Sequence, residues 1–527
     1  MADKKQQNSL DPVLDASIFS LIRQGKHDDA WKRTLDLNEI FRLYYQIQIK
    51  LDQAQYIESQ KILEEALNLT YNHPDPKIKN IWYKLKLYKI VVLLIIDAKK
   101  GIDANNDFHS IPQPENEFTL GMNNLISGLI HNDPSYFKAS IDHLKASEEL
   151  IMLGLSYIFL CHYYGGEKAI KLADEAIGIF QQFGHKNYVS ISMCLKGYFY
   201  QSLGDYKTAR VLNTKAFEEC SKTNWIHGVA NANICLGSIA IEEGNISEAI
   251  RRLEFSSKKF YQDQGTFPGL AILIEAYRFA GMYNQGLEVS LDMLDRTTVT
   301  DPIIYEYFFV QITLLALNLN QLDRAKELYE HFKVLVGTTP NSRIENSLKL
   351  CEALILKQSK SLRTSYKAQD MMRELLQSDA VSYTNRIVIL KHLSELLLLE
   401  YELYEQEEIL DEVQQYVNNL FEISKTQNLL RLTFEAQIIS SKLELLKNDF
   451  GKARKILVDL LDYAGANNLS VYERVVSKEI AVLDENYNKW LDLVEGNSSM
   501  RELMEKTKIK NYMTNAIKLG LISDFES

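Results

Sequence analysis

Residues 202–220 read SLGDYKTARVLNTKAFEEC, and residues 242–260 read EEGNISEAIRRLEFSSKKF. Both phrases carry Gly, then Asp or Asn, then a small residue at the same offsets, which makes Ala209 and Ala249 equivalent positions forty residues apart. Apolar residues follow each alanine at the spacing of an amphipathic helix. The repetition therefore predicts that each phrase is a turn followed by a helix, and that the chain is built from copies of one helical unit.

Equivalent anchor positions extend this pattern over the middle of the chain. Successive anchors are separated by 40, 40, 37 and 39 residues, which is in the range of arrays of helical hairpins. More degenerate copies, with a period of about 37–43 residues, are expected toward both ends of the chain. The anchors are Ala169, Ala209, Ala249, Gly286 and Ala325.

Small residues recur where two helices must approach closely. Gly197 and Gly237 stand twelve positions before their anchors, and a glycine inside a helix costs about 1 kcal/mol relative to alanine, so its presence needs a packing reason. A Gly or Asn five positions before each anchor is expected to end the first helix in the left-handed conformation. These residues are Gly204, Gly244, Gly281 and Asn320.

The second helix of each hairpin has its own start and packing signals. Asp205, Asn245 and Asp323 are expected near its first turn, where a side-chain oxygen can accept from free backbone N–H groups. Large apolar residues after the anchor are expected to fill the space between hairpins. These are Val211 with Leu212, Leu253 with Phe260, and Leu328 with Phe332.

This skeleton resembles the tetratricopeptide repeat, a helical hairpin with small residues at the helix crossing, a turn glycine, a following aromatic and two alanines in the second helix. The match is best at residues 187–223 and continues through residues 225–335. The chain departs from the family pattern because Met193 and Asn233 replace its usual Trp and because the period exceeds the usual 34 residues. The resemblance implies an all-α fold, a superhelical α-solenoid of antiparallel helix pairs.

The periodicity also suggests how the chain is divided. Residues 1–100 are expected to form N-terminal helical hairpins of degenerate repeats, and residues 101–121, with Pro112 and Pro114, a loop or linker. Residues 122–485 are expected to form the solenoid, which is clearest at 150–335. Residues 486–527 are expected to form a C-terminal capping helix or tail, because a stack needs a polar-faced last element.

Charge and hydropathy limit the partners and the compartment. The 527 residues include 59 Lys and Arg against 70 Asp and Glu, a net charge of −11, which argues against a dedicated nucleic-acid-binding protein. The run IVVLLII at 90–96 is too short to span a bilayer. Five cysteines without a CxxC pair and a polar N-terminus without a signal-peptide core indicate a reducing, cytoplasmic location.

Motifs that carry chemistry are missing from the sequence. It contains no HExxH pair, no P-loop, no GxGxxG phrase and no GxSxG elbow. We therefore expect no metal, no cofactor and no enzymatic activity. Cys194 and Cys235 occupy nearly equivalent places in consecutive first helices. Small apolar packing is the favoured interpretation of this pair, and a reactive pair is the alternative.

The resemblance implies that the first helices of the hairpins form the inner wall of a groove that binds a partner segment. Asn and Gln there could bond the backbone of an extended peptide, and Tyr could supply contact area. The opposing interpretation is an unused solvated face. In this register the inward positions are Tyr198, Gln201, Asn231, Ser238, Glu275, Arg278, Tyr307 and Gln311.

Three functions follow in decreasing order of support. The first is a non-enzymatic scaffold or adaptor that binds a protein or peptide partner in the concave groove. The second is a ligand- or peptide-sensing regulatory domain, which would act with a separate effector module because none is visible in this chain. The third is an enzyme with an unrecognised site. The sequence does not identify the partner, the pathway or the oligomeric state.

Overall fold

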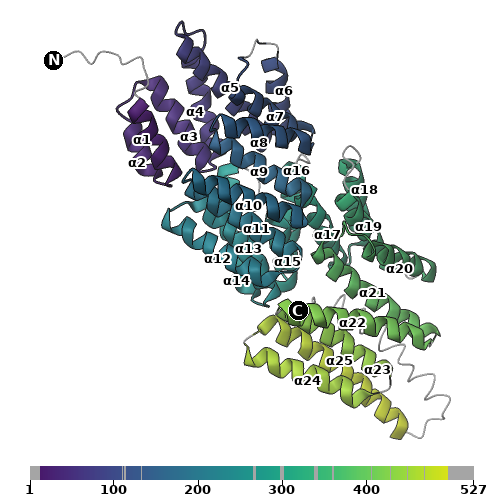
Figure 1. Ribbon diagram of the computed structural model, residues 1–527. Helices are drawn as coiled ribbons and strands as arrows, with labels where there is room; N and C mark the ends of the chain where they lie inside the picture. The colour runs from purple at the N-terminus through teal and green to yellow at the C-terminus, as the bar shows by residue number, and fades with distance from the viewer. Residues whose placement is uncertain are drawn as a thin grey trace. The chain divides into compact units, whose positions relative to one another are not determined.

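The computed structural model describes residues 12–109, 111, 114–131, 133–264, 269–296, 302–336, 342–358, 361–404, 406–427, 429–447, 449–467 and 469–495. Every regular element in these ranges is an α-helix (Figure 1). The helices divide into two compact units. The first unit takes the described parts of 1–236, 252–269 and 293–302, and the second those of 237–251, 270–292 and 303–527.

Helices α1 to α12 belong to the first unit. Their bounds are α1 Pro12–Arg23, α2 His27–Thr34, α3 Glu39–Asp52, α4 Tyr56–Thr70, α5 Pro76–Ile96, α6 Ala98–His109, α7 Glu117–His131, α8 Pro134–Ala146, α9 Leu150–Tyr164, α10 Gly166–Gln182, α11 Lys186–Ser202 and α12 Tyr206–Lys222. The unit boundary passes through α13 (Ile226–Glu242) and α14 (Ile246–Gln264).

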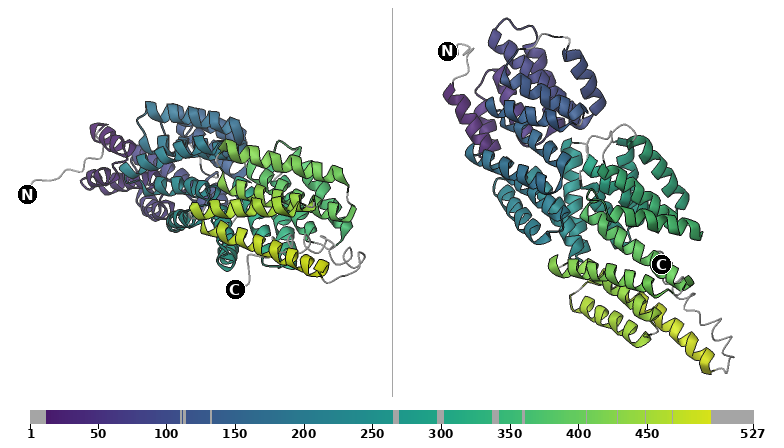
Figure 2. Two further views of the ribbon diagram at one scale, coloured as in Figure 1. Left: turned by 90° about the horizontal axis from the view of Figure 1, so that it is seen from below. Right: turned by 45° about the vertical axis from the view of Figure 1, so that its right-hand side comes forward.

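The second unit contains the end of α13, the start of α14, all of α15, most of α16 and the helices that follow. Their bounds are α15 Leu270–Ala280, α16 Tyr283–Arg296, α17 Pro302–Asn318, α18 Leu322–Val336, α19 Ser342–Lys357, α20 Leu362–Leu376, α21 Tyr383–Tyr404, α22 Glu407–Gln427, α23 Leu430–Leu446, α24 Phe450–Ala466 and α25 Ser470–Glu495. Most consecutive helices within a unit pack against each other, as α10 does with α11 and α23 with α24, and their ribbons run side by side (Figure 2).

The turns between paired helices form as the repeat predicts. Gly204, Gly244, Gly281 and Asn320 have φ of 88°, 78°, 79° and 56°, the left-handed conformation that ends the first helix at little steric cost for glycine. Asp205 Oδ1 accepts from Thr208 N at 2.9 Å, and Asn245 Oδ1 accepts from Glu248 N at 3.3 Å. Asp323 instead lies in the first turn of α18, where it pairs with Lys326 at 3.3 Å.

The small residues lie at the helix crossings. The alanine anchors Ala169, Ala209, Ala249 and Ala325 have no exposed surface. A Cβ atom on Gly197 would lie 2.4 Å from the side-chain nitrogen of Asn213 on the paired helix, so only glycine fits there. Close approach of the two helices of a pair therefore determines the repeat.

Large apolar residues fill the space around these crossings, with one exception. Leu253, Phe260, Leu328 and Phe332 are all at most 4% exposed, as predicted. The prediction for Val211 is wrong: its side chain is 69% exposed. Two residues after the anchor on an α-helix is a rotation of about 200°, which places Val211 on the solvent side of α12.

The segment 101–121 is mostly helical, which corrects the predicted loop. Helix α6 continues to His109 and α7 begins at Glu117. Phe108 is 2% exposed and packs against Tyr83, and Gly101 lets α6 approach Leu94. A few buried contacts thus outweigh the polar composition that suggested a loop. The predicted tail at 486–527 overlaps the end of α25 and otherwise lies outside the described residues.

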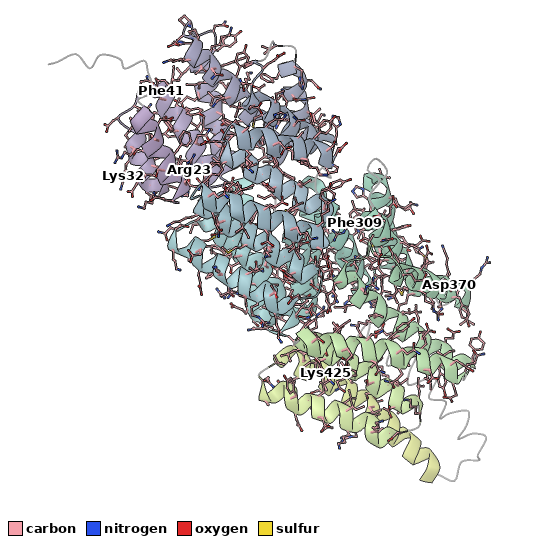
Figure 3. All side chains as sticks on the ribbon, viewed as in Figure 1. Arg23, Lys32, Phe41, Phe309, Asp370 and Lys425 are labelled. Atoms are coloured by element: carbon pink, nitrogen blue, oxygen red, sulfur yellow. The ribbon has the colours of Figure 1, made fainter. Side chains whose placement is uncertain are left out.

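Aromatic side chains fill the core of each unit. Phe137 and Phe180 are buried in the first unit, and Phe308, Phe332 and Phe434 in the second. The labelled Phe41 and Phe309 are buried within their units, whereas Lys32 and Asp370 project outward (Figure 3). The predicted fold class is confirmed: the described chain is an all-α array of antiparallel helix pairs, like that of tetratricopeptide repeats.

Candidate functional site

The odd-numbered helices, which come first in each pair, also contact one another. In the first unit α1 packs on α3, and α5, α7, α9 and α11 pack in series, while in the second unit α19, α21 and α23 do the same. Each unit therefore has a layer of first helices. The eight sequence-predicted binding residues all lie on odd-numbered helices.

Three of the predicted residues belong to the first unit. Tyr198 on α11 is half-buried, and its ring centroid lies 6.5 Å from that of His162. Gln201 on the same helix is 6% exposed. Asn231 on α13 is half-buried and donates to the backbone oxygen of His227 at 3.1 Å. Asn231 is thus bonded within its own helix, and these residues do not form one cluster.

Four predicted residues of the second unit are brought together. Arg278 Nε on α15 donates to Gln311 Oε1 on α17 at 3.4 Å. Glu275 and Tyr307, on the same two helices, share a side-chain hydrogen bond. Glu275 is 4% exposed and Gln311 is fully buried, whereas Arg278 and Tyr307 are half-buried. The eighth residue, Ser238, is half-buried on α13.

Residues that sequence reasoning missed complete this group. Arg431 on α23 binds Glu242 at the end of α13 with both ends of its guanidinium, with Nε 3.0 Å from Oε2. Arg431 Nη1 also lies 3.6 Å from Glu435 Oε1, and Lys391 Nζ on α21 lies 3.3 Å from the same oxygen. We call these four residues with Glu275, Arg278, Tyr307 and Gln311 the Arg431 cluster.

The charges of the Arg431 cluster balance. Three carboxylates, Glu242, Glu275 and Glu435, are matched by Arg278, Lys391 and Arg431. Burial would raise the pKa of Glu435, but Lys391 and Arg431 outweigh it, so that pKa is lowered. Burial and the Glu275 charge raise the pKa of Tyr307 well above 10.0. The phenol therefore stays protonated at neutral pH and is not a general base.

Buried pairing also explains Arg431 and Glu242. Burial opposes the charge of Arg431, but its carboxylate neighbours outweigh burial and raise its pKa well above the ordinary value of a guanidinium. Burial raises the pKa of Glu242 while the guanidinium opposes that rise. A fixed cation therefore faces Glu242 at every accessible pH. The pair of Arg431 and Glu242 can hold α13 against α23, and the polar atoms of the two side chains bond each other.

A second buried group lies on α19 and α21. Lys357 Nζ donates to His392 Nδ1 at 2.7 Å and pairs with Glu395. Burial and the Lys357 charge lower the pKa of His392 to about 4. The imidazole is therefore neutral, and its Nδ1 accepts a hydrogen bond from the Lys357 ammonium group. Burial also lowers the pKa of Lys357. This lysine, imidazole and carboxylate satisfy one another within the helix layer.

The first unit has its own buried polar group. Asp52, at the end of α3, lies 2.7 Å from His27 Nε2, 3.0 Å from His185 Nε2 and 2.8 Å from Asn187 Nδ2. All four side chains are buried. We call them the Asp52 cluster. Burial would raise the pKa of Asp52, but the charges and hydrogen bonds of His185 and His27 outweigh it and lower that pKa.

The pairing of Asp52 with histidine resembles the base of a catalytic dyad, but its contacts hold helices of the first unit together. His27 and Asn187 both bond Asp52 Oδ2, and His185 lies beside the other carboxylate oxygen. These contacts join α2, α3 and α11, which are up to 160 residues apart in sequence. No feature of the sequence pattern indicated this pairing, because single histidines and asparagines at long separation carry no local signal.

Other groups with possible chemistry are also buried. All five cysteines are buried and free. Burial raises the pKa of Cys235 to about 12, which agrees with the packing interpretation. Over the described ranges, no three His, Cys, Asp or Glu side chains are arranged to hold a metal ion. In the same part of the chain, no helix is both long and apolar enough to cross a membrane.

No protein-family model and no curated protein sequence matches the chain. Many solved structures are similar to it, and two of them illustrate the low level of similarity. The TPR domain of P58(IPK) is 14% identical, with 79% of this chain and 99% of that chain covered, and a TM-score of 0.20. The pentatricopeptide repeat protein PPR10 from maize is 14% identical, with 88% of this chain and 74% of that chain covered, and a TM-score of 0.23.

Proposed function

We propose that the chain is a non-enzymatic scaffold that binds a protein or peptide partner along the layer of first helices. The observation that carries this proposal is the repeated contact between odd-numbered helices, which forms a layer of first helices in each unit. A regular layer of this kind can contact an extended segment over several turns. The histidines, carboxylates and lysine that might have suggested catalysis are used in buried pairs.

The residues proposed for the interface are the eight inward positions. Tyr198, Asn231, Ser238, Arg278 and Tyr307 are half-buried and retain surface for a partner. Gln201, Glu275 and Gln311 are buried, so their proposed role is to support that surface. A tyrosine supplies large contact area with few rotatable bonds, and an asparagine can bond a peptide backbone of any sequence.

Affinity purification from source lysate followed by mass spectrometry tests the proposal. We expect the wild type to capture a reproducible set of proteins, and Tyr198→Ala with Asn231→Ala to lose part of it. Lys207→Ala with Lys215→Ala, at exposed positions of α12, is the matched control. The proposed function is wrong if the Tyr198 and Asn231 variant retains every specific partner. Nuclease treatment of the lysate should leave the captured set unchanged.

A further inference from the structure

One small surface of the first unit gathers positive charge around a tyrosine. It is formed by Lys138 on α8, Tyr163 and Tyr164 at the end of α9, and Lys168 in the first turn of α10, and we call it the Tyr164 patch. Lys168 Nζ lies 3.3 Å from the ring centroid of Tyr164, and Lys138 Nζ lies 5.4 Å from it. Both lysines are exposed, and both tyrosines are half-buried.

The two ammonium groups lie near the same tyrosine ring. Neither Lys138 nor Lys168 forms an ion pair within 4.0 Å with a carboxylate of the described residues. Two like charges near one ring repel each other, so the local potential is positive. The positive charge affects the Tyr164 phenol. A hydrogen bond from Lys138 is the main reason that the pKa of Tyr164 is lowered, and Lys168 lowers it further.

This charge is unusual for the chain as a whole, whose net charge is −11. A ligand with closely spaced carboxylates would neutralise both ammonium groups and gain contact area from the two rings. Nucleic acid fits less well. Lys168 covers one face of Tyr164, and Tyr163 meets it edge-on at 89°, so the pair is not an open platform for base stacking.

We propose that the Tyr164 patch is a docking surface for an acidic segment of a partner protein, one that carries two or more neighbouring Asp or Glu residues. This inference rests on the proposed scaffold function and specifies the chemistry of the partner. The patch also adjoins the proposed interface, because His162 precedes Tyr163 and contacts Tyr198.

Fluorescence anisotropy with the full chain and a labelled peptide of ten glutamates tests this assignment. We expect saturable binding at 50 mM salt that weakens as salt is raised, since exposed charges are screened. Lys138→Gln with Lys168→Gln should weaken binding by about tenfold, the combined effect of two exposed ion pairs. Lys138→Arg with Lys168→Arg keeps the charge and should stay within about threefold of wild type.

The control is Lys207→Gln with Lys215→Gln, which removes the same charge from α12 and should change the affinity less than twofold. The assignment is overturned if wild type does not bind the peptide, or if the control weakens binding as much as the patch variant. It is also overturned if ten-nucleotide oligothymidylate or vesicles with anionic lipid bind more tightly at the same residues. A lysate capture lost on Tyr198→Ala but unaffected by the patch variant would reject the patch and leave the scaffold function standing.

Discussion

The two units join distant inner helices with buried charges of opposite sign. In the first unit a single acid, Asp52, accepts hydrogen bonds from His27 and Asn187 and lies 3.0 Å from His185 Nε2, and it joins α3 to α11 over 135 residues of sequence. In the second unit a single guanidinium, Arg431, binds carboxylates and joins α13 to α23 over 189 residues. The first unit thus holds distant helices together around an anion that can be protonated, and the second unit does so around a cation that stays charged.

The difference shows which part of the fold is repetitive and which is not. The hairpins of both units use the same small residues and left-handed turns. The contacts between inner helices far apart in sequence use unrelated residues, because each depends on side chains that meet only after the helices have stacked. Hairpin packing and long-range closure can therefore be tested separately.

The largest expected effect is at Arg431. Arg431→Met leaves Glu242 buried without its cation and leaves Glu435 with Lys391 alone, so we expect a loss of about 3–5 kcal/mol of stability in the second unit. Hydrogen exchange resolved by helix would show the loss in α13 and α23. The control Arg251→Met breaks an exposed pair with Glu248 on α14 and should cost less than about 1 kcal/mol. Similar losses of stability in both variants would contradict the role of Arg431 in joining α13 to α23.

Asp52 gives the corresponding test in the first unit. Asp52→Asn removes the charge that His27 and His185 bind, and we expect a loss of about 2–3 kcal/mol, the range for buried hydrogen bonds to a charged group. Exchange should increase in α2, α3 and α11 and remain unchanged in the second unit. Asp174→Asn, at an exposed ion pair with Lys196, is the control. Equal changes in exchange in both units would mean that the Asp52 cluster does not stabilise the first unit specifically.

The Asp52 contribution should depend on pH. Its pKa is lowered from 3.8 in the folded chain, so its stabilising effect is present above about 3.8 and is lost as pH falls toward the folded value. The stability difference between wild type and Asp52→Asn should therefore shrink as pH falls below about 4. Denaturant unfolding of the first unit at several pH values measures it. A difference that grows as pH falls below about 4 would refute this sign.

Overpacking a helix crossing should affect the two units equally. Ala209→Leu in the first unit and Ala249→Leu in the second both add volume at a fully buried anchor, so each should destabilise its unit by about 1–3 kcal/mol. Lys207→Leu, at an exposed site of the same helix as Ala209, should change stability by less than about 0.5 kcal/mol. Thermal unfolding would detect the contrast. Equal effects at Ala209 and Lys207 would show that the register of the repeat is wrong.

The smallest effect concerns a turn that departs from the glycine rule. Ala54 in the first unit has φ of 55°, a conformation that is strained for any residue with a Cβ atom. Ala54→Gly should therefore stabilise the first unit by about 0.5–1 kcal/mol, after allowance for the greater freedom of glycine in the unfolded chain. Gly204→Ala, at φ of 88°, is the reverse test and should destabilise it. Destabilisation by Ala54→Gly would contradict this account of the turns.

Much of the local structure could be predicted because it is determined by residues close in sequence. The glycines and Asn320 at the turns, the caps at Asp205 and Asn245, and the buried alanines all follow from contacts within one hairpin. The error at Val211 came from assigning a face of α12 from an apolar residue alone. The loop predicted at 101–121 was wrong because it was inferred from the polar composition of the segment. Composition does not reveal the few buried contacts that Phe108 and Gly101 make.

The candidate site was predicted only in part. Four of the eight inward positions meet in the Arg431 cluster because they share the register of α15 and α17. Their partners Glu242, Arg431, Glu435 and Lys391 were missed. Arg431 and Glu435 are spaced as an i, i+4 pair, but the same helix also carries Lys442, Glu444 and several neutral polar residues. The spacing therefore gave no signal that these charges are buried, and the pairing with Glu242 had no local signal either.

The sequence by itself determined the helix pairs of this protein, because close helix crossings and left-handed turns select small residues at fixed spacing. Only the tertiary structure decided which inner helices meet and which charges they bury. Such contacts depend on the summed rotation of many stacked hairpins, and no local pattern of residues records that sum. The pairs around Asp52 and Arg431 are therefore properties of the folded units.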